Sequence, residues 1–291
     1  GLGTIANAKF SHAEGESTTT EGQSSHAEGL STFAGGSYSH TEGESSLTSG
    51  QSSHAEGFKT NAVGQFSHAE GESTASKGPS AHAEGYSTSA DGQYSHSEGE
   101  YCVAVERASH AEGLTTTANG SHSHAEGTET DATGPSSHAE GFRTVSVGAY
   151  SHAEGESTSA DDAGAHAEGF KTIARAVYSH SEGDGSAAKG RASHAEGAST
   201  STNGMYAHAE GAVSQANGES SHAEGQGSTA EGQTSHSEGA NTTANGTSSH
   251  AEGDYTLAAG IAAHAEGRST EAVGDQSHAE GLKTRAVGVE S

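Results

Sequence analysis

Small side chains recur at alternate positions of this chain, in short runs that end at a glycine. Side chains alternate between the two faces of a strand. In Ser-His-Ala-Glu-Gly, Ser, Ala and Gly would therefore share one face, and His and Glu the other. In Thr-x-Ala-x-Gly, the variable positions would face away from Thr, Ala and Gly. The pattern predicts two short strands, each followed by a glycine-marked bend, around an interior too narrow for larger side chains.

The two runs together form a repeat of 14 residues. Twenty histidines follow one another at this spacing from His12 to His278, each followed by Glu two residues later and Gly three residues later. A twenty-first histidine, His122, lies outside the register. A fixed period of this kind is typical of a solenoid, in which each repeat packs on its neighbours. We therefore expect an all-β fold, a parallel β-solenoid with one coil per repeat and about 20 coils, as a single repeat domain over residues 1–291.

Glycine recurs at two columns of the repeat, numbered from its histidine: the fourth and the eleventh. Such columns suit a positive φ or a close approach of two backbones. The turn glycines expected on this basis include Gly15, Gly22, Gly29 and Gly64. An α-helix is excluded, because about two glycines in 14 residues, each costing about 0.8–1 kcal/mol relative to Ala, would destabilise it.

Composition alone would give a different picture. The chain of 291 residues is 29% hydrophobic and has a formal charge of −27, which is typical of disorder. The strict period overrules that interpretation. The acidic balance without a basic patch argues against nucleic acid and anionic membranes as partners. No apolar run has the length of a membrane-spanning helix, and the start does not resemble a signal peptide. We expect the chain to be a fragment of a longer protein.

The two outward faces of the predicted coil differ. The eighth and tenth positions vary widely, whereas the His/Glu face is the same in all twenty copies. Solvent imposes no such uniformity, so something uniform is expected to pack along this face. An identical chain is the simplest candidate.

The Ser-His-Ala-Glu-Gly block, with Ala-x-Gly seven residues later, resembles the 14-residue repeat of YadA-like heads of trimeric autotransporter adhesins. The resemblance covers the whole chain and matches the Ser, Ala and Gly columns. It departs where the family has Val and Ile facing the trimer centre, since this chain has His and Glu. The His-Ala-Glu-Gly form is also similar to repeats in phage tail-fibre proteins, some of which carry a self-cleaving chaperone domain that is not visible here.

The resemblance implies a left-handed parallel β-roll and a side-by-side homotrimer with the His and Glu columns at its interface. The interface residues implied include His12, Glu14, His26, Glu28, His54, Glu56, His138, Glu140, His222, Glu224, His278 and Glu280. Buried charges must be paired, so we expect hydrogen-bonded His–Glu pairs between chains or between layers. A nearby carboxylate raises the pKa of histidine, which predicts protonated histidines and pH-sensitive assembly.

The columns of the repeat also allow metal binding, catalysis and ice binding to be considered. Imidazole and carboxylate bind transition metals, so His68 with Glu70 is the alternative metal pair, although twenty consecutive sites would be unusual. We expect no metal and no cofactor. Ser and His are adjacent in a strand and point to opposite faces, which argues against a catalytic triad. Ice binding is disfavoured because the Thr column is predicted to face inward.

Aromatic residues flank the invariant columns. One set lies two residues before a histidine (Tyr38, Phe66, Tyr94, Tyr150, Tyr178 and Tyr206), and another follows the signature glycine (Phe58, Tyr86, Phe142 and Phe170). They are expected to cover the edges of the interchain seam, with a carbohydrate-binding stripe as the alternative. Cys102 replaces Thr in an inward column and is expected to be a buried, inert thiol. The stretch 101–106 lacks its glycine and is expected to be irregular.

The resemblance implies a rigid, extended, homotrimeric surface fibre that mediates attachment, either an adhesin head or a phage tail-fibre shaft. Its place would be extracellular, on a cell or virion surface, with a host-surface glycan or protein as a further partner. A structural filament or spacer without a ligand is the alternative, and enzymatic activity is not expected.

Overall fold

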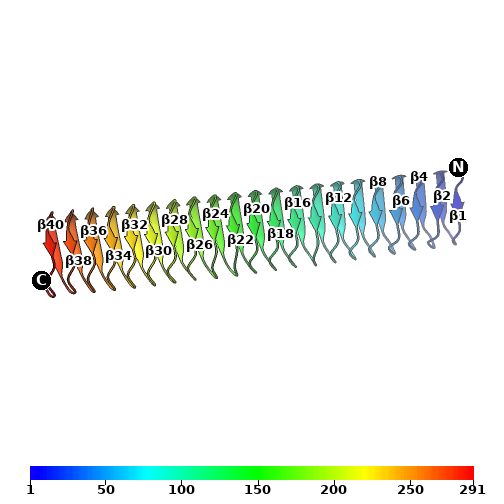
Figure 1. Ribbon diagram of the computed structural model, residues 1–291. Coiled ribbons are helices and arrows are strands. Elements are labelled where there is room, and N and C mark those ends of the chain that lie inside the picture. Colours follow the sequence, from blue (N-terminus) through cyan, green and yellow to red (C-terminus); the bar gives the residue numbers. More distant parts are fainter. The chain divides into compact units, whose positions relative to one another are not determined.

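The computed structural model describes residues 1–291 and contains strands and turns but no helix. Contacts between residues divide it into two compact units, Gly1–Ser146 and Val147–Ser291. In both units each 14-residue repeat makes one turn of a parallel β-solenoid, with a five-residue strand that begins at the histidine and a two-residue strand (Figure 1). The predicted all-β solenoid of about 20 turns is therefore confirmed.

The first unit has ten long strands and eleven short ones. The long strands are β2 (His12–Glu16), β4 (His26–Leu30), β6 (His40–Glu44), β8 (His54–Phe58), β10 (His68–Glu72), β12 (His82–Tyr86), β14 (His96–Glu100), β16 (His110–Leu114), β18 (His124–Thr128) and β20 (His138–Phe142). The short strands are β1 (Ile5–Ala6), β3 (Thr19–Thr20), β5 (Phe33–Ala34), β7 (Leu47–Thr48), β9 (Asn61–Ala62), β11 (Ala75–Ser76), β13 (Ser89–Ala90), β15 (Val103–Ala104), β17 (Thr117–Ala118), β19 (Asp131–Ala132) and β21 (Val145–Ser146).

The second unit repeats this plan with ten strands of each kind. Its long strands are β22 (His152–Glu156), β24 (His166–Phe170), β26 (His180–Asp184), β28 (His194–Ala198), β30 (His208–Ala212), β32 (His222–Gln226), β34 (His236–Ala240), β36 (His250–Asp254), β38 (His264–Arg268) and β40 (His278–Leu282). Its short strands are β23 (Ser159–Ala160), β25 (Ile173–Ala174), β27 (Ala187–Ala188), β29 (Ser201–Thr202), β31 (Gln215–Ala216), β33 (Thr229–Ala230), β35 (Thr243–Ala244), β37 (Leu257–Ala258), β39 (Glu271–Ala272) and β41 (Arg285–Ala286).

Strands pair with their equivalents one turn away, parallel and without a shift in register. In β10 and β12, His68 lies opposite His82 and Glu70 opposite Glu84. In β28 and β30, His194 lies opposite His208 in the same way. Each column of the repeat is therefore a stack of equivalent residues along the unit.

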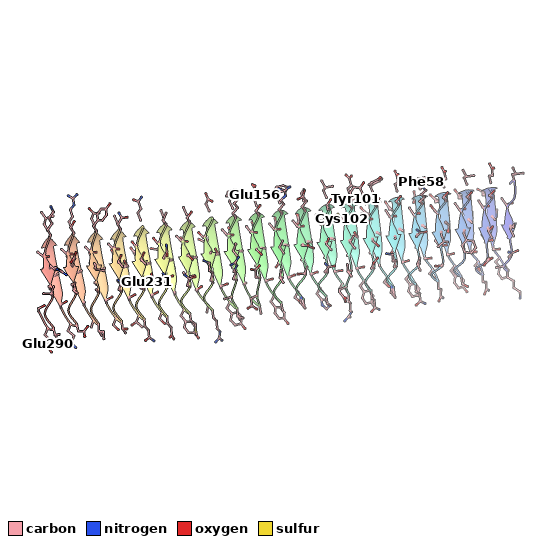
Figure 2. The ribbon with its side chains drawn as sticks, viewed as in Figure 1. Phe58, Tyr101, Cys102, Glu156, Glu231 and Glu290 are labelled. Carbon is pink, nitrogen blue, oxygen red and sulfur yellow. The ribbon has the colours of Figure 1, made fainter.

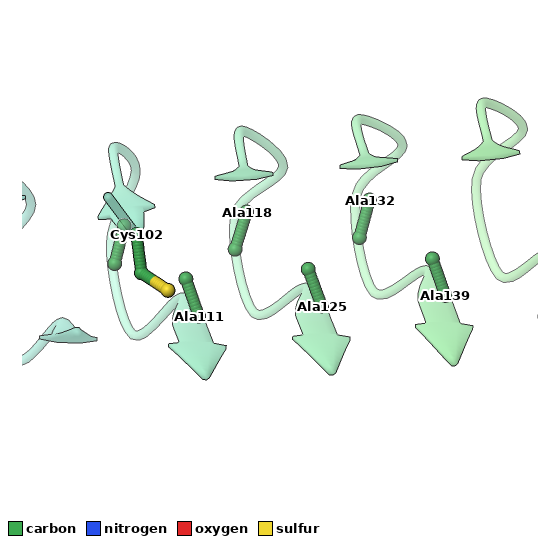
Figure 3. Packing of buried hydrophobic residues seen from close by; sticks show 7 residues of the cluster. Cys102, Ala111, Ala118, Ala125, Ala132 and Ala139 are labelled. Atoms are coloured by element: carbon green, nitrogen blue, oxygen red, sulfur yellow. The ribbon is translucent and has the colours of Figure 1, made fainter. Parts of the chain in front are cut away.

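The interior holds five of the six columns predicted to face inward, all but the glycine at the fourth position. Its buried hydrophobic residues are alanines, with Cys102 as the one exception, and the other interior side chains are Ser and Thr. In the first unit, the side chains of Cys102 and Ala111 point into the space between the two rows of strands (Figure 3). Cys102 is fully buried, as expected, and its thiol contacts the carbonyl oxygen of Gly113 at 3.2 Å. Each alanine buries little apolar area, so the backbone ladder has to contribute much of the stability.

Serine at the last position of the repeat closes the turn that precedes the long strand. The hydroxyl of Ser67 donates a hydrogen bond of 2.7 Å to the carbonyl of Gly64, and Ser221 does the same to Gly218 at 2.8 Å. These serines are buried, so the bond satisfies a hydroxyl that would otherwise be costly to bury.

The predicted turn glycines are needed for two different reasons. Gly15 and Gly29 have φ of 109° and 106°, and a Cβ on either would lie 2.0 or 2.1 Å from a carbonyl oxygen of the next turn. At Gly22 and Gly64 the close approach alone matters, since a Cβ would lie 1.8 or 2.0 Å from the glycine oxygen one turn on. Gly22 and Gly64 are buried, so the inward position expected of them is correct. Gly15 and Gly29 are not buried and lie inside strands β2 and β4, so both their expected inward position and their expected place in a turn are wrong.

The bends themselves fall on residues that the glycine pattern did not predict. The sixth and thirteenth positions have φ values of about +50° to +62° although most are not glycine, as in Ser17, Ser24, Lys59 and Tyr94. The left-handed region is uncommon for such residues. The in-register ladder of each unit holds them there.

The expected irregularity over residues 101–106 is wrong for the strands. Strand β15 pairs in register with β13 and β17. Glu106 occupies the place of the missing glycine, and its carbonyl accepts the usual hydrogen bond from Ser109, at 2.7 Å. The eleventh position does not require a positive φ, and at Glu106 the neighbouring strands stay in register although this residue carries a Cβ.

A positive φ and a close backbone approach can be tested separately at two glycines, Gly183 in strand β26 and Gly185 in the turn after it. Gly183 has φ of 101° and its Cβ would lie 2.2 Å from the oxygen of Gly197, whereas a Cβ on Gly185 (φ 66°) would meet nothing nearer than 3.7 Å. We expect Gly183→Ala to lower the free energy of unfolding by about 3 kcal/mol or more, because the backbone must shift. Gly185→Ala is expected to cost only about 1–2 kcal/mol. Denaturant unfolding of both variants measures the difference, and equal losses would contradict it.

Candidate functional site

The His and Glu columns lie together on the outside of the long strands. His is the first residue and Glu the third of each long strand, so both side chains leave the same face. In most repeats each is half-buried, as for His96 and Glu98, both 35% exposed. The structure therefore places the predicted interface residues on one face of each unit.

Within a repeat, the imidazole approaches its own carboxylate. The distance from Nε2 to Oε2 is 3.2 Å for His12 and Glu14, where a hydrogen bond forms. It is 3.6 Å for His26 and Glu28 and 4.0 Å for His194 and Glu196. These longer separations exceed a hydrogen bond. The close contact thus lies within a repeat, in sixteen of the twenty repeats, whereas the expected pairing was between chains or between layers. Pairing between chains stays a prediction.

Between repeats, histidine stacks on histidine. The ring centroids of His82 and His96 are 4.9 Å apart with an interplanar angle of 4°, and those of His222 and His236 are 4.8 Å apart at 1°. The rings meet edge to face at the ends, where His12 lies at 79° to His26 and His264 at 78° to His278, and they are tilted by 32° between His40 and His54. Each ring thus covers the faces of its neighbours.

This stacking changes the electrostatics expected from the sequence. Burial lowers the pKa of His180 below 6.5, the stacked His194 and His166 lower it further, and the neighbouring Glu182 and Glu168 raise it by less. The pKa is also lowered, with burial as the largest cause, for His68, His110, His166, His194, His222 and His250. For these seven histidines the pKa shift is opposite to the one expected from the neighbouring carboxylate, and protonation in an assembly stays a prediction.

The histidine Nε2 atoms form a row of covered polar atoms. In His26, His68 and His222 this atom is inaccessible to solvent and has no hydrogen-bond partner. A covered polar atom without a partner costs free energy. Polar atoms of the His/Glu face thus lack hydrogen-bond partners within the single chain.

The alternative metal pair His68 and Glu70 does come together with a third ligand. Ligand atoms of His68, Glu70 and His82 lie within 4.8 Å of one another, and other repeats are similar. An ion held at about 2.1 Å from each ligand needs them within about 4.2 Å of one another. Parallel rings also direct their Nε2 lone pairs side by side, so the rings would have to tilt before they could share an ion.

Serine and histidine of one repeat do not meet. Ser221 is buried and bonded to Gly218, whereas His222 lies on the outer face. A serine nucleophile needs its base within hydrogen-bond reach. This arrangement offers no such pair.

The two aromatic sets differ in their surroundings. Phe142 and Phe170 are 37% and 36% exposed, and a neighbouring cation lies over each ring, at 4.6 Å for Arg143 and 4.5 Å for Lys171. Phe58 belongs to this set and lies at the edge of the first unit in Figure 2. The set before the histidine is more open, with Tyr150 at 76% and Tyr178 at 64%. The out-of-register His122 lies in this second column and contacts Ser121.

The chain matches no model of a known protein family and no curated protein. The structure contains no helix long and apolar enough to cross a membrane.

Acid is expected to destabilise the fold through the histidine ladder. A lowered pKa in the folded state means that the unfolded chain binds more protons below about pH 6.5, so stability is complete above that pH and falls as the pH drops below it. Thermal unfolding followed by circular dichroism from about pH 8 to about pH 5 measures the effect. The double variant His180→Gln, His194→Gln should weaken the dependence, and His122→Gln should not. A melting temperature that rises on acidification would contradict the lowered pKa values.

Proposed function

We propose that this chain is part of a homotrimeric surface fibre that mediates attachment, either an adhesin head or a phage tail-fibre shaft. In this proposal three left-handed coils lie side by side with their His/Glu faces together. The protein would act outside the cell, on a cell or virion surface.

The observation that carries the proposal is the state of the His/Glu face. The face is identical in all twenty repeats, half-buried, and lined by Nε2 atoms that lack a partner, as in His68 and His222. A second chain that presents its carboxylates would supply those partners at every turn. Histidines with a lowered pKa suit such a contact, because a neutral imidazole can still donate one hydrogen bond to a carboxylate.

In this proposal the seam, which is the contact between the His/Glu faces of the three chains, requires no protonated histidine. The carboxylates of three acidic chains would still repel one another, so each must accept a hydrogen bond at the interface. Phe58, Phe142 and Phe170, which are already partly covered, would lie along the edges of the seam.

A spacer without a ligand is the second candidate. It is favoured by the outward faces of the short strands, where successive repeats place different residues, such as Ser201, Gln215 and Thr229. A ligand that was bound along this face would meet a different surface at every turn.

Molar mass in solution tests the proposal. Sedimentation equilibrium is expected to give about three times the chain mass of 28.9 kDa. Replacing His and Glu by Ser in three successive repeats (residues 208, 210, 222, 224, 236 and 238) should shift the equilibrium toward monomer, because it removes the shared contacts. The control replaces Gln215 and Asn217 of the variable face by Ser and should remain trimeric. A monomeric wild-type chain would overturn the trimer.

A further inference from the structure

One column of the repeat has twice the period of the others. At the thirteenth position, aromatic residues occur every 28 residues at Phe10, Tyr38, Phe66 and Tyr94, and the repeats between them have Ser24, Ser52 and Ser80. The second unit continues the alternation, with Tyr150, Tyr178 and Tyr206 separated by Gly164 and Ala192. Large flat side chains and very small ones therefore alternate from turn to turn. We call this column the aromatic stripe.

The stripe is exposed and evenly spaced within each unit. Tyr38 and Phe66 are each 57% exposed, and Tyr206 is 53% exposed. Equivalent residues one turn apart are separated by about 4.8 Å, as the rings of His54 and His68 show. Aromatic rings of the stripe therefore recur at about twice that distance, since they occupy every second turn.

The small residues explain how the rings lie. At Gly164, a Cβ would be only 2.6 Å from Cδ1 of the Tyr178 ring. Tyr178 thus leans over the turn before its own, and only a small residue fits beneath it. A ring that rests on the turn below leaves its other face toward solvent. From Tyr38 on, the other aromatic residues of the stripe follow Ser or Ala one turn before, whose Cβ keeps those rings farther from the preceding turn than the Tyr178 ring is from Gly164.

The stripe and the column directly before it are uncharged or basic over most of their length, although the chain has 39 acidic residues. Neither the stripe nor the column before it contains Asp or Glu from residue 9 to residue 206. In the first unit that neighbouring column is rich in glutamine, and Nε2 of Gln65 donates a hydrogen bond of 3.0 Å to Oε1 of Gln51. Exposed ring faces beside side-chain amides offer stacking together with donors and acceptors for hydroxyl groups.

We propose that the aromatic stripe binds an extended, neutral, β-1,4-linked polysaccharide that runs along the unit. Successive sugars of such a chain face opposite ways, so every second sugar presents the same face, and one disaccharide is close in length to two turns of this solenoid. Each ring would stack on one sugar per disaccharide, and glutamines such as Gln51 and Gln65 would bond its hydroxyls. A polyanionic glycan is disfavoured by the formal charge of −27.

This inference rests on the proposed attachment function for its biological sense, but it uses residues outside the His/Glu face. Its failure is therefore distinguishable from failure of the trimer. Loss of glycan binding with an unchanged molar mass would concern the stripe alone, and a change of molar mass would concern the contact between chains.

The test measures retention of the whole chain on insoluble cellulose and chitin, and its mobility in gels containing a soluble neutral β-1,4-glucan. The wild-type chain is expected to bind. The variant Tyr38→Ser, Phe66→Ser, Tyr94→Ser should bind about tenfold more weakly or worse. Serine is the matched replacement because Ser52 and Ser80 already occupy the same turn conformation, with φ of 54° and 56°. Circular dichroism checks that the variant is folded.

A second pair of variants tests the spacing. Tyr38→Ser with Ser52→Tyr keeps the number of aromatic residues and breaks the two-turn interval, so it should weaken binding of long glycans as removal of a ring does. Tyr255→Ser removes an exposed aromatic residue from another column, in which Ser269 already occupies the same turn conformation, and should leave binding unchanged. The proposal is overturned if the wild-type chain binds none of these glycans, or if the triple variant binds them as well as the wild type. It is also overturned if the triple variant loses its oligomeric state, since the stripe would then be a contact between chains.

Discussion

The parallel, in-register backbone ladder is the constraint on which the rest of each unit depends. Each residue pairs with its own equivalent 14 positions away, as Ala69 does with Ala83. The interior alanines supply too little apolar area to hold such a structure by burial alone, so the ladder must be unbroken. That requirement keeps glycine where two backbones nearly touch, as at Gly64. It also holds Ser17 and Tyr94 in a left-handed conformation that they would rarely adopt by themselves.

The same ladder determines the chemistry of the outer face. Because it stacks equivalent residues, a charge at one histidine would meet a histidine on each side, and the carboxylates beside it compensate only in part. His180 therefore has a lowered pKa despite Glu182. The carboxylate of the same repeat raises the histidine pKa, but burial of the ring and the stacked histidines of the neighbouring repeats lower it by more. For the seven histidines with a lowered pKa, burial together with this stacking favours the neutral form, which suits hydrogen bonding more than charge pairing.

Most of the fold could be predicted from the sequence, because alternation and period specify which columns face inward. The buried columns, the buried Cys102 and the need for glycine at Gly22 and Gly29 were predictable for this reason. The bends at residues such as Ser24 and Lys59 were not, since their left-handed conformation comes from the ladder and leaves no mark in residue type. Glycine at Gly185 and Gly227 in the same column was the only signal. The direction of the histidine pKa shifts was also missed, because a strand considered alone shows the neighbouring Glu and hides the stacked His.

Two periods in one chain indicate two kinds of constraint. The fold treats every turn alike, so it explains columns that repeat every 14 residues. It also explains why a small residue such as Gly164 must precede a ring such as Tyr178. It does not explain why the ring is there, because the same column holds Ser220, Thr234 and Ser248 in turns with the same backbone conformation. The turn is thus formed equally well without an aromatic residue. A row of exposed rings that the backbone does not require, kept at a two-turn interval, points to something outside the chain that has the same interval.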